Sequence, residues 1–241
     1  MKLFHRLFDQ PADSPAGVTT DPAELLHTVV LDDRRLAALD RQAAAPVAVT
    51  VINGTGAGGI TALAGRSLAT LELAGVQTAV RDPGDLGGNI ARISAAAREL
   101  DPDVAVLVEI PDGFGWAEAV AAAEAEGLTA VVGWDSPERS ATRLSAFIEA
   151  DLPFVVDDVD TTGRLLALLV AVDRLIDDPD IDAVAEILAA ADHDQPAEDV
   201  LHWDEDRAGR VRRRLRAVRV RGLPAMIADL TQAGLIDRPA T

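Results

Sequence analysis

The sequence predicts an α/β fold in the form of a (β/α)8-like barrel, and two observations carry this prediction. First, residues 47–82 run from an apolar strand through a turn with four glycines into a helical segment and a second strand. Second, the apolar segments are nearly continuous runs of Val, Ala and Leu, which is typical of parallel strands covered by helices on both faces. About eight such strands in a chain of this length fit a barrel, regular or irregular.

Each expected strand is an apolar run that ends at a polar or turn residue, and the segments between strands have helical periodicity. Asp32 or Asp33 is expected to cap the first helix, whereas Gly75 and Gly127 are expected to end helices in a left-handed conformation. The expected strands are 28–31, 47–52, 76–80, 104–110, 128–132, 153–156, 200–203 and 218–220. The expected helices are 33–41, 60–74, 86–100, 116–126, 137–150, 162–176, 181–191, 207–216 and 224–233.

The domain organisation follows from the distribution of prolines and apolar runs. Residues 1–20 are rich in turn-forming residues, and we expect a loosely held arm with one strand near residues 3–8. Asp21, Pro22 and Glu24 form a helix-start pattern. Residues 21–241 are then expected to form a single barrel-like domain.

Composition excludes several classes of function. The net charge is -18, from 40 acidic and 22 basic residues, and such a surface repels phosphate backbones, so we do not expect a nucleic-acid partner. The absence of cysteine excludes disulfides and thiolate chemistry, and the absence of tyrosine removes the usual acid of short-chain reductases. No apolar run approaches the roughly 20 residues of a membrane span, so we expect a cytoplasmic protein without a membrane partner.

The ligand site of a parallel α/β fold lies at the carboxyl ends of its strands. Polar residues there predict a pocket for a small polar, anionic metabolite. The ligand-binding residues predicted from this position are Asn53, Trp134, Asp157, Arg219 and Arg221.

Glu109 is the predicted catalytic residue. It ends the apolar strand in VLVEIP and precedes a proline, so it is not needed as a helix cap. A carboxylate delivered to the barrel mouth by such a strand would be partly desolvated, which suits acid/base chemistry. The alternative is a carboxylate that merely binds a neighbouring loop.

The glycine turn allows three interpretations. Gly54, Gly56 and Gly59 match the dinucleotide fingerprint, and Asp82 ends the next strand, as in a Rossmann-type NAD(P) oxidoreductase. The same turn also binds simple anions at a helix start, or permits close packing. A closed barrel would exclude the Rossmann crevice, so strand connectivity separates the two enzyme hypotheses.

The remaining charged clusters add one alternative function. The histidines are not spaced as metal ligands are. The aspartates at 157, 158 and 160 could bind a cation, but they are more typical of loop carboxylates that face water. The sequence identifies no cofactor. We expect the arginines of the basic helix to form ion pairs with acidic residues of the same protein. The alternative is that they bind an acidic partner, which would make the protein a noncatalytic interaction module. The oligomeric state stays open. The arginines of this helix are Arg207, Arg210, Arg212, Arg213, Arg214 and Arg216.

Between Leu25 and Ile236 the chain resembles an uncharacterised bacterial family of TIM-barrel-like proteins. The resemblance is carried by TVVLDDRRLAAL, VLVEIP, LPFVVDDVDTTGRLLALLVA and RRRLRAVRVRGLPAMIADLTQAGLI. It implies a barrel fold. The family carries a lysine and two histidines on the strand matching residues 152–158, and an arginine and glycines after the strand matching residues 128–134. These are replaced here, so the resemblance implies a divergent member that keeps only Glu109.

Overall fold

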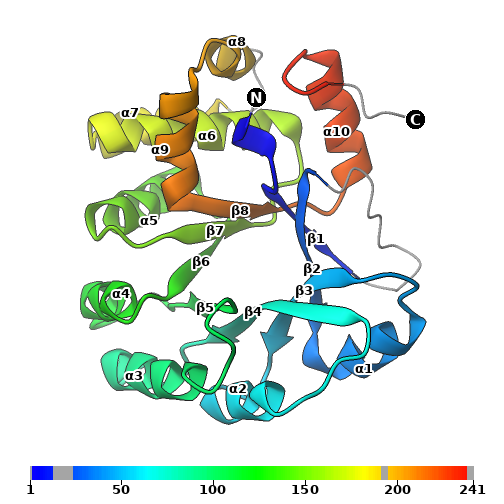
Figure 1. Ribbon diagram of the computed structural model, residues 1–241. Coiled ribbons are helices and arrows are strands. Elements are labelled where there is room, and N and C mark those ends of the chain that lie inside the picture. Colours follow the sequence, from blue (N-terminus) through cyan, green and yellow to red (C-terminus); the bar gives the residue numbers. More distant parts are fainter. Residues whose placement is uncertain (1, 13–23, 191–194, 238–241) are drawn as a thin grey trace. The chain divides into compact units, whose positions relative to one another are not determined.

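The computed structural model describes residues 2–12, 24–190 and 195–237 (Figure 1). Eight strands form a closed barrel in the order in which they occur in the chain, and the pairings along it are parallel, which confirms the predicted fold class. The strands are β1 (Phe8–Pro11), β2 (Leu26–Asp32), β3 (Val47–Asn53), β4 (Leu71–Ala79), β5 (Ala105–Glu109), β6 (Thr129–Gly133), β7 (Phe154–Asp157) and β8 (Leu215–Arg219).

Helices follow most of these strands, as the alternating pattern predicts. Asp32 is the N-cap of the first helix and accepts a hydrogen bond from the Arg34 amide, which confirms one of the two expected caps. The helices are η1 (Lys2–Phe4), α1 (Asp33–Gln42), α2 (Ala57–Ala64), α3 (Leu86–Ala97), α4 (Trp116–Ala125), α5 (Pro137–Glu149), α6 (Thr162–Asp177), α7 (Ile181–Ala189), α8 (Gln195–Leu201), α9 (Glu205–Arg214) and α10 (Leu223–Gln232).

Contacts divide the chain into two compact units. Unit 1 comprises residues 1–9, 21–27 and 132–241, and unit 2 comprises residues 10–20 and 28–131. In unit 1, β7 and β1 both pair with β8. In unit 2, β3 lies between β2 and β4, and β5 pairs with β4 and with the first part of β6.

The amino-terminal segment differs from the expected loose arm over its described residues. Leu3 and Phe4 of η1 are fully buried, as are Leu7, just before β1, and Phe8, its first residue. The Phe8 amide donates to the Leu25 carbonyl, which attaches this segment to the start of β2. The strand runs over residues 8–11 rather than 3–8, because the first apolar pair packs from a turn of 3-10 helix. Residues 13–20 of the expected arm, and most of the helix-start pattern at 21–24, lie outside the described residues.

Two elements were wrongly predicted. Residues 200–203 do not form a strand; they include the end of α8, and Val200 and Trp203 are buried at helical spacing. The segment expected as a helix over 60–74 ends as α2 at Ala64, and β4 begins at Leu71. Gly75 is therefore a strand residue and not a helix end, whereas Gly127 has the expected positive φ of 67°.

The start of β4 has a tertiary cause. The carboxylate of Asp40, on α1, accepts hydrogen bonds from the backbone amides of Ala69, Thr70 and Leu71 at 2.8–3.1 Å. These bonds lower the pKa of Asp40 from its ordinary value. They satisfy amides that a helix would otherwise use, so the chain leaves the helical path before residue 69.

Candidate functional site

Arg219, the last residue of β8, is the largest fully buried side chain in unit 1 and has a relative exposure of 1%. Its Nη1 donates to Asp157 Oδ2, on β7, at 3.3 Å, and its Nε lies 4.0 Å from Asp9 Oδ2, on β1. Nε and Nη2 have no hydrogen-bond acceptor among the described residues. A buried guanidinium with two unsatisfied nitrogens is costly, so this site calls for an acceptor that the described side chains do not supply.

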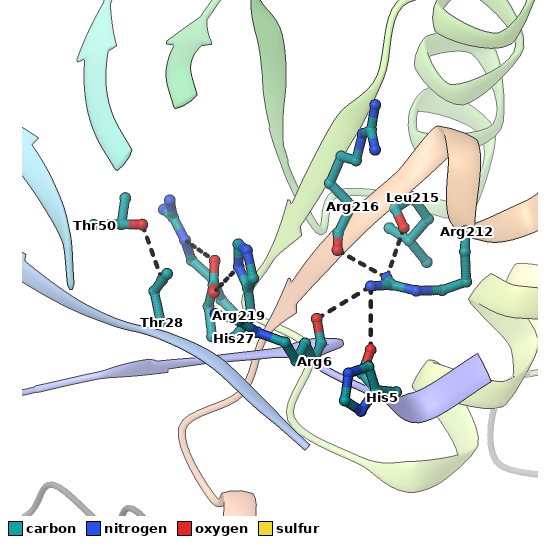
Figure 2. Close-up of polar contacts among 10 residues, drawn as sticks. His5, Arg6, His27, Thr28, Thr50, Arg212, Leu215, Arg216 and Arg219 are labelled. Atoms are coloured by element: carbon teal, nitrogen blue, oxygen red, sulfur yellow. Dashed lines mark hydrogen bonds and ion pairs between the residues drawn. The ribbon is translucent and has the colours of Figure 1, made fainter. Parts of the chain in front are cut away.

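Asp9 also orients a histidine in the same cluster. His27 Nδ1, on β2, lies 3.0 Å from Asp9 Oδ1, and Figure 2 shows the imidazole beside Arg219. We assign the proton to Nδ1, because an ionised carboxylate only accepts hydrogen bonds, and this assignment leaves Nε2 as the accepting nitrogen. The His27 side chain is 37% exposed while Asp9 is buried, so the imidazole reaches solvent. The cluster therefore contains a buried cation, Arg219, and a proton acceptor, His27, with Asp9 between them.

Sequence reasoning found Arg219 and Asp157 but missed Asp9 and His27. Asp9 lies within the expected loose arm, residues 1–20, and the histidines show no metal-ligand spacing, so the sequence singles out neither Asp9 nor His27. One feature of the sequence could have revealed Asp9. The residues just before it include four large apolar side chains, which predict a packed segment and hence a buried neighbour: Leu3, Phe4, Leu7 and Phe8.

Two further predicted residues lie near this cluster. The Trp134 amide, just after β6, donates to the Asp157 carbonyl at 3.2 Å, and the guanidinium of Arg164 lies 5.3 Å from the Trp134 ring. Arg221 pairs with Asp158 at 3.1 Å but is 78% exposed. Trp134 and Asp157 therefore lie together with Arg219, whereas Arg221 is a surface ion pair beside them.

Glu109 lies in unit 2 and is exposed. Its carboxylate accepts a hydrogen bond from the Gln77 side chain, and Gln77 on β4 is buried. Glu109 is thus open to solvent, and its predicted acid/base role stays a prediction. The geometry resembles the alternative interpretation, a carboxylate that holds a neighbouring group.

The glycine turn, also in unit 2, is filled by its own side chains. Asn53 Nδ2 donates to the Gly56 carbonyl at 2.6 Å, and Asn53 Oδ1 accepts from both the amide and the hydroxyl of Thr55. A Cβ on Gly59 would lie 2.0 Å from Asn53 Oδ1, so this glycine is required by close packing. Gly56 is required for another reason, since its φ is +71°, and Gly54 has open space around it.

The basic helix α9 divides its arginines between three environments, all in unit 1. Arg207 donates twice to Asp173, a buried residue of α6, which raises the pKa of Arg207, and Arg210 pairs with Asp177 at 3.0 Å. Arg212 points to the amino-terminal segment, where it contacts the carbonyls of His5 and Arg6 (Figure 2). Arg214 forms an ion pair with Asp151. The side chains of Arg213, near the end of α9, and of Arg216, on β8, are exposed and have no partner among the described residues.

Arg212 binds four carbonyl groups. Nη1 donates to the carbonyls of Leu215 and Arg216 at 2.8 Å, and Nη2 to those of Arg6 and His5 at 3.1 and 3.5 Å. Burial and the charge of Arg216 lower the pKa of Arg212 to about 10, so it stays charged at neutral pH. This side chain ties the start of the chain to the junction of α9 and β8.

In the described ranges, no three His, Asp or Glu side chains are grouped closely enough to hold a metal ion. Of the helices that the structure describes, none is both long and apolar enough to cross a bilayer.

Fold and site together define a class, a (β/α)8 barrel protein with a buried arginine at the carboxyl end of one strand. No known protein family, curated protein or solved structure matches the chain. The barrel implied by the sequence resemblance is therefore observed in the structure, whereas membership of the bacterial family has no support from these comparisons.

Proposed function

We propose that this barrel binds a small anion that also carries hydroxyl groups, with Arg219 as the group that binds the negative charge. The observation that carries the proposal is that Arg219 is fully buried and yet has Nε and Nη2 without an acceptor. A carboxylate or phosphate oxygen is the acceptor that a guanidinium fork prefers. The proposal keeps the small polar, anionic ligand that the sequence predicts and assigns its site to unit 1.

The neighbouring carboxylates refine the ligand chemistry. Asp157 and Asp9 flank the guanidinium, so a ligand with only negative charge would be repelled by them. A ligand with hydroxyl groups can donate hydrogen bonds to Asp157, which is 39% exposed, while its anionic group reaches Arg219. A small hydroxy acid or sugar phosphate meets both requirements.

His27 supplies the chemistry that an enzyme with this site would use. Asp9 holds the imidazole with its basic Nε2 free of described partners, an arrangement typical of a general base. His27 therefore replaces Glu109 in the proposed acid/base role. The NAD(P) oxidoreductase alternative loses its basis, because the strands close into a barrel and have no switch-point crevice.

A thermal-shift screen tests the proposed site. The probes are glycerate, malate, glycerol 3-phosphate and propionate, each added at constant ionic strength and at about 100 times a millimolar-range Kd or as close as solubility allows. Binding at that level adds about 2.7 kcal/mol of stability. We expect a hydroxylated anion to raise Tm and propionate, which lacks a hydroxyl, to have no effect. A screen in which no hydroxylated anion raises Tm overturns the proposal.

Variants then locate the site. Arg219→Lys keeps the charge but loses the fork, and should abolish the shift, whereas Arg66→Lys, on an exposed arginine of unit 2, should leave it unchanged. If Arg219→Lys does not fold, Asp157→Ala serves instead, because that side chain is partly exposed; it should weaken binding at least about tenfold, since one hydrogen bond to a charged group is worth 1.5–3 kcal/mol. Equal shifts in wild type and in the folded variant would contradict the assignment to Arg219.

A further inference from the structure

A second basic feature of unit 1 is separate from the Arg219 site. It is a pocket of about 430 Å³ at the amino ends of β7 and β8, where the α5–β7 loop, the end of α6 and the end of α9 meet. Active sites of barrels occupy the opposite, carboxyl ends of the strands, so this pocket is not part of the site proposed above. Its lining residues are Asp151, Pro153, Ile176, Arg210, Arg213, Arg214 and Arg216.

The charge of this pocket is opposite to that of the whole chain. Four arginines and one aspartate line it, whereas the protein as a whole has a net charge of -18. Arg210 is neutralised by Asp177, and Arg214 forms an ion pair with the Asp151 carboxylate. The guanidinium groups of Arg213 and Arg216 have no partner within the described part of the chain, so two positive charges remain uncompensated.

Structural roles account for part of this arginine cluster only. Arg213 and Arg214 lie in the last turn of α9, where positive charge stabilises the helix dipole. Arg216 lies beyond the helix, and its charge is unfavourable to Arg212, contributing to the lowered pKa of that residue. An exposed arginine held near another without an acid to balance it is better explained by an anion that occupies the pocket.

We propose that this pocket binds a small molecule carrying two or more phosphate groups. Two free guanidinium groups in one cavity match two anionic groups, and each can form a paired, charge-assisted contact with phosphate oxygens. A phosphate carries a charge of about -1.5 to -2 at neutral pH, more than a carboxylate, and so neutralises these arginines best. The volume is in the range of small-molecule sites and exceeds the need of a single phosphate ion.

Calorimetric titration of the full chain tests this assignment. The probes are tripolyphosphate, pyrophosphate, orthophosphate and citrate. We expect the two polyphosphates to bind one per chain, to bind more tightly than orthophosphate and citrate, and to weaken with added salt. Citrate binding as tight as tripolyphosphate, or no polyphosphate binding at all, would overturn the proposal.

Two matched double variants test whether the polyphosphate binds at Arg213 and Arg216. Arg213→Gln with Arg216→Gln should reduce polyphosphate affinity by at least about tenfold, because two charge-assisted contacts are lost. Arg66→Gln with Arg81→Gln removes the same charge from exposed positions of unit 2 and should leave affinity unchanged. Equal losses in both double variants would show a general charge effect and refute the pocket.

A third experiment distinguishes the arginine pocket from the Arg219 site and from a surface that binds an acidic protein. Arg219→Lys should not alter polyphosphate binding, so failure of the metabolite site and failure of the arginine pocket are distinguishable. A polyglutamate peptide should not compete for the pocket. A peptide that binds while tripolyphosphate does not would refute the small-molecule site in favour of an acidic protein partner.

Discussion

At the scale of single residues, Gly58 and Gly59 are adjacent in α2 but have different reasons to be glycine. A Cβ on Gly59 would collide with Asn53 and Thr55, whereas a Cβ on Gly58 would meet nothing within 4 Å. We expect Gly59→Ala to destabilise the protein by about 1–3 kcal/mol, because the Asn53 side chain must leave its position.

Gly58→Ala is the matched control for that prediction and should stabilise the protein by up to about 1 kcal/mol, since alanine is favoured over glycine in a helix. Denaturant unfolding of both variants measures the difference. Equal free energies of unfolding would contradict the account of the glycine turn as a packed structure.

Arg212 is a second residue whose role is local and structural. Arg212→Met keeps the length of the side chain but leaves the carbonyls of residues 5, 6, 215 and 216 without their donor. We expect a loss of about 1–3 kcal/mol, the cost of unsatisfied buried polar groups. Arg213→Met, on an exposed neighbour, should change the free energy of unfolding by less than about 0.5 kcal/mol. A similar loss in both variants would show that the charge of α9, and not the carbonyl contacts, is what matters.

At the scale of elements, the carboxylate of Asp40 links α1 to the start of β4. Three amides at the start of β4 lower the pKa of this carboxyl, so the ionised form is bound more tightly in the folded state. Because the pKa of Asp40 is lower in the folded state than in the unfolded state, its ionised carboxylate stabilises the fold at every pH above the unfolded-state pKa. This stabilisation is lost as the pH falls through the folded-state pKa.

We therefore expect Asp40→Asn to be less stable than wild type at neutral pH, with a difference that shrinks below about pH 4, where the unfolded carboxyl is protonated. Asp103→Asn, on an exposed loop aspartate, is the control and should show no such trend. The measurement is the free energy of unfolding across the acid range. A difference that stays constant with pH would show that the amides do not distinguish the ionised form.

At the scale of the whole molecule, net charge opposes compactness. With a net charge of -18, we expect Tm to rise from about 20 mM to about 200 mM salt, because screening weakens repulsion between the acidic residues. Surface pairs such as Arg34 with Asp32 and Arg139 with Asp135 act in the other direction, since salt weakens them too. A flat or falling Tm would show that these pairs outweigh the repulsion.

The sequence by itself determined the class of fold, because hydrophobic period and turn residues are local properties. The runs at 47–52 and 128–132 could be recognised as buried parallel strands without knowing their neighbours. The strand at residues 200–203 was wrong, because a short apolar run has no period of its own and its helical packing depends on what it contacts.

Only the tertiary structure decided the candidate site. Asp9, His27, Asp157 and Arg219 meet because β1 and β7 both pair with β8, and none of these pairings is local in the chain. Likewise, β4 begins where a carboxylate about 30 residues away binds its amides. Contacts between distant residues are made by burial and pairing, which no single segment encodes, so the site's chemistry followed from the fold.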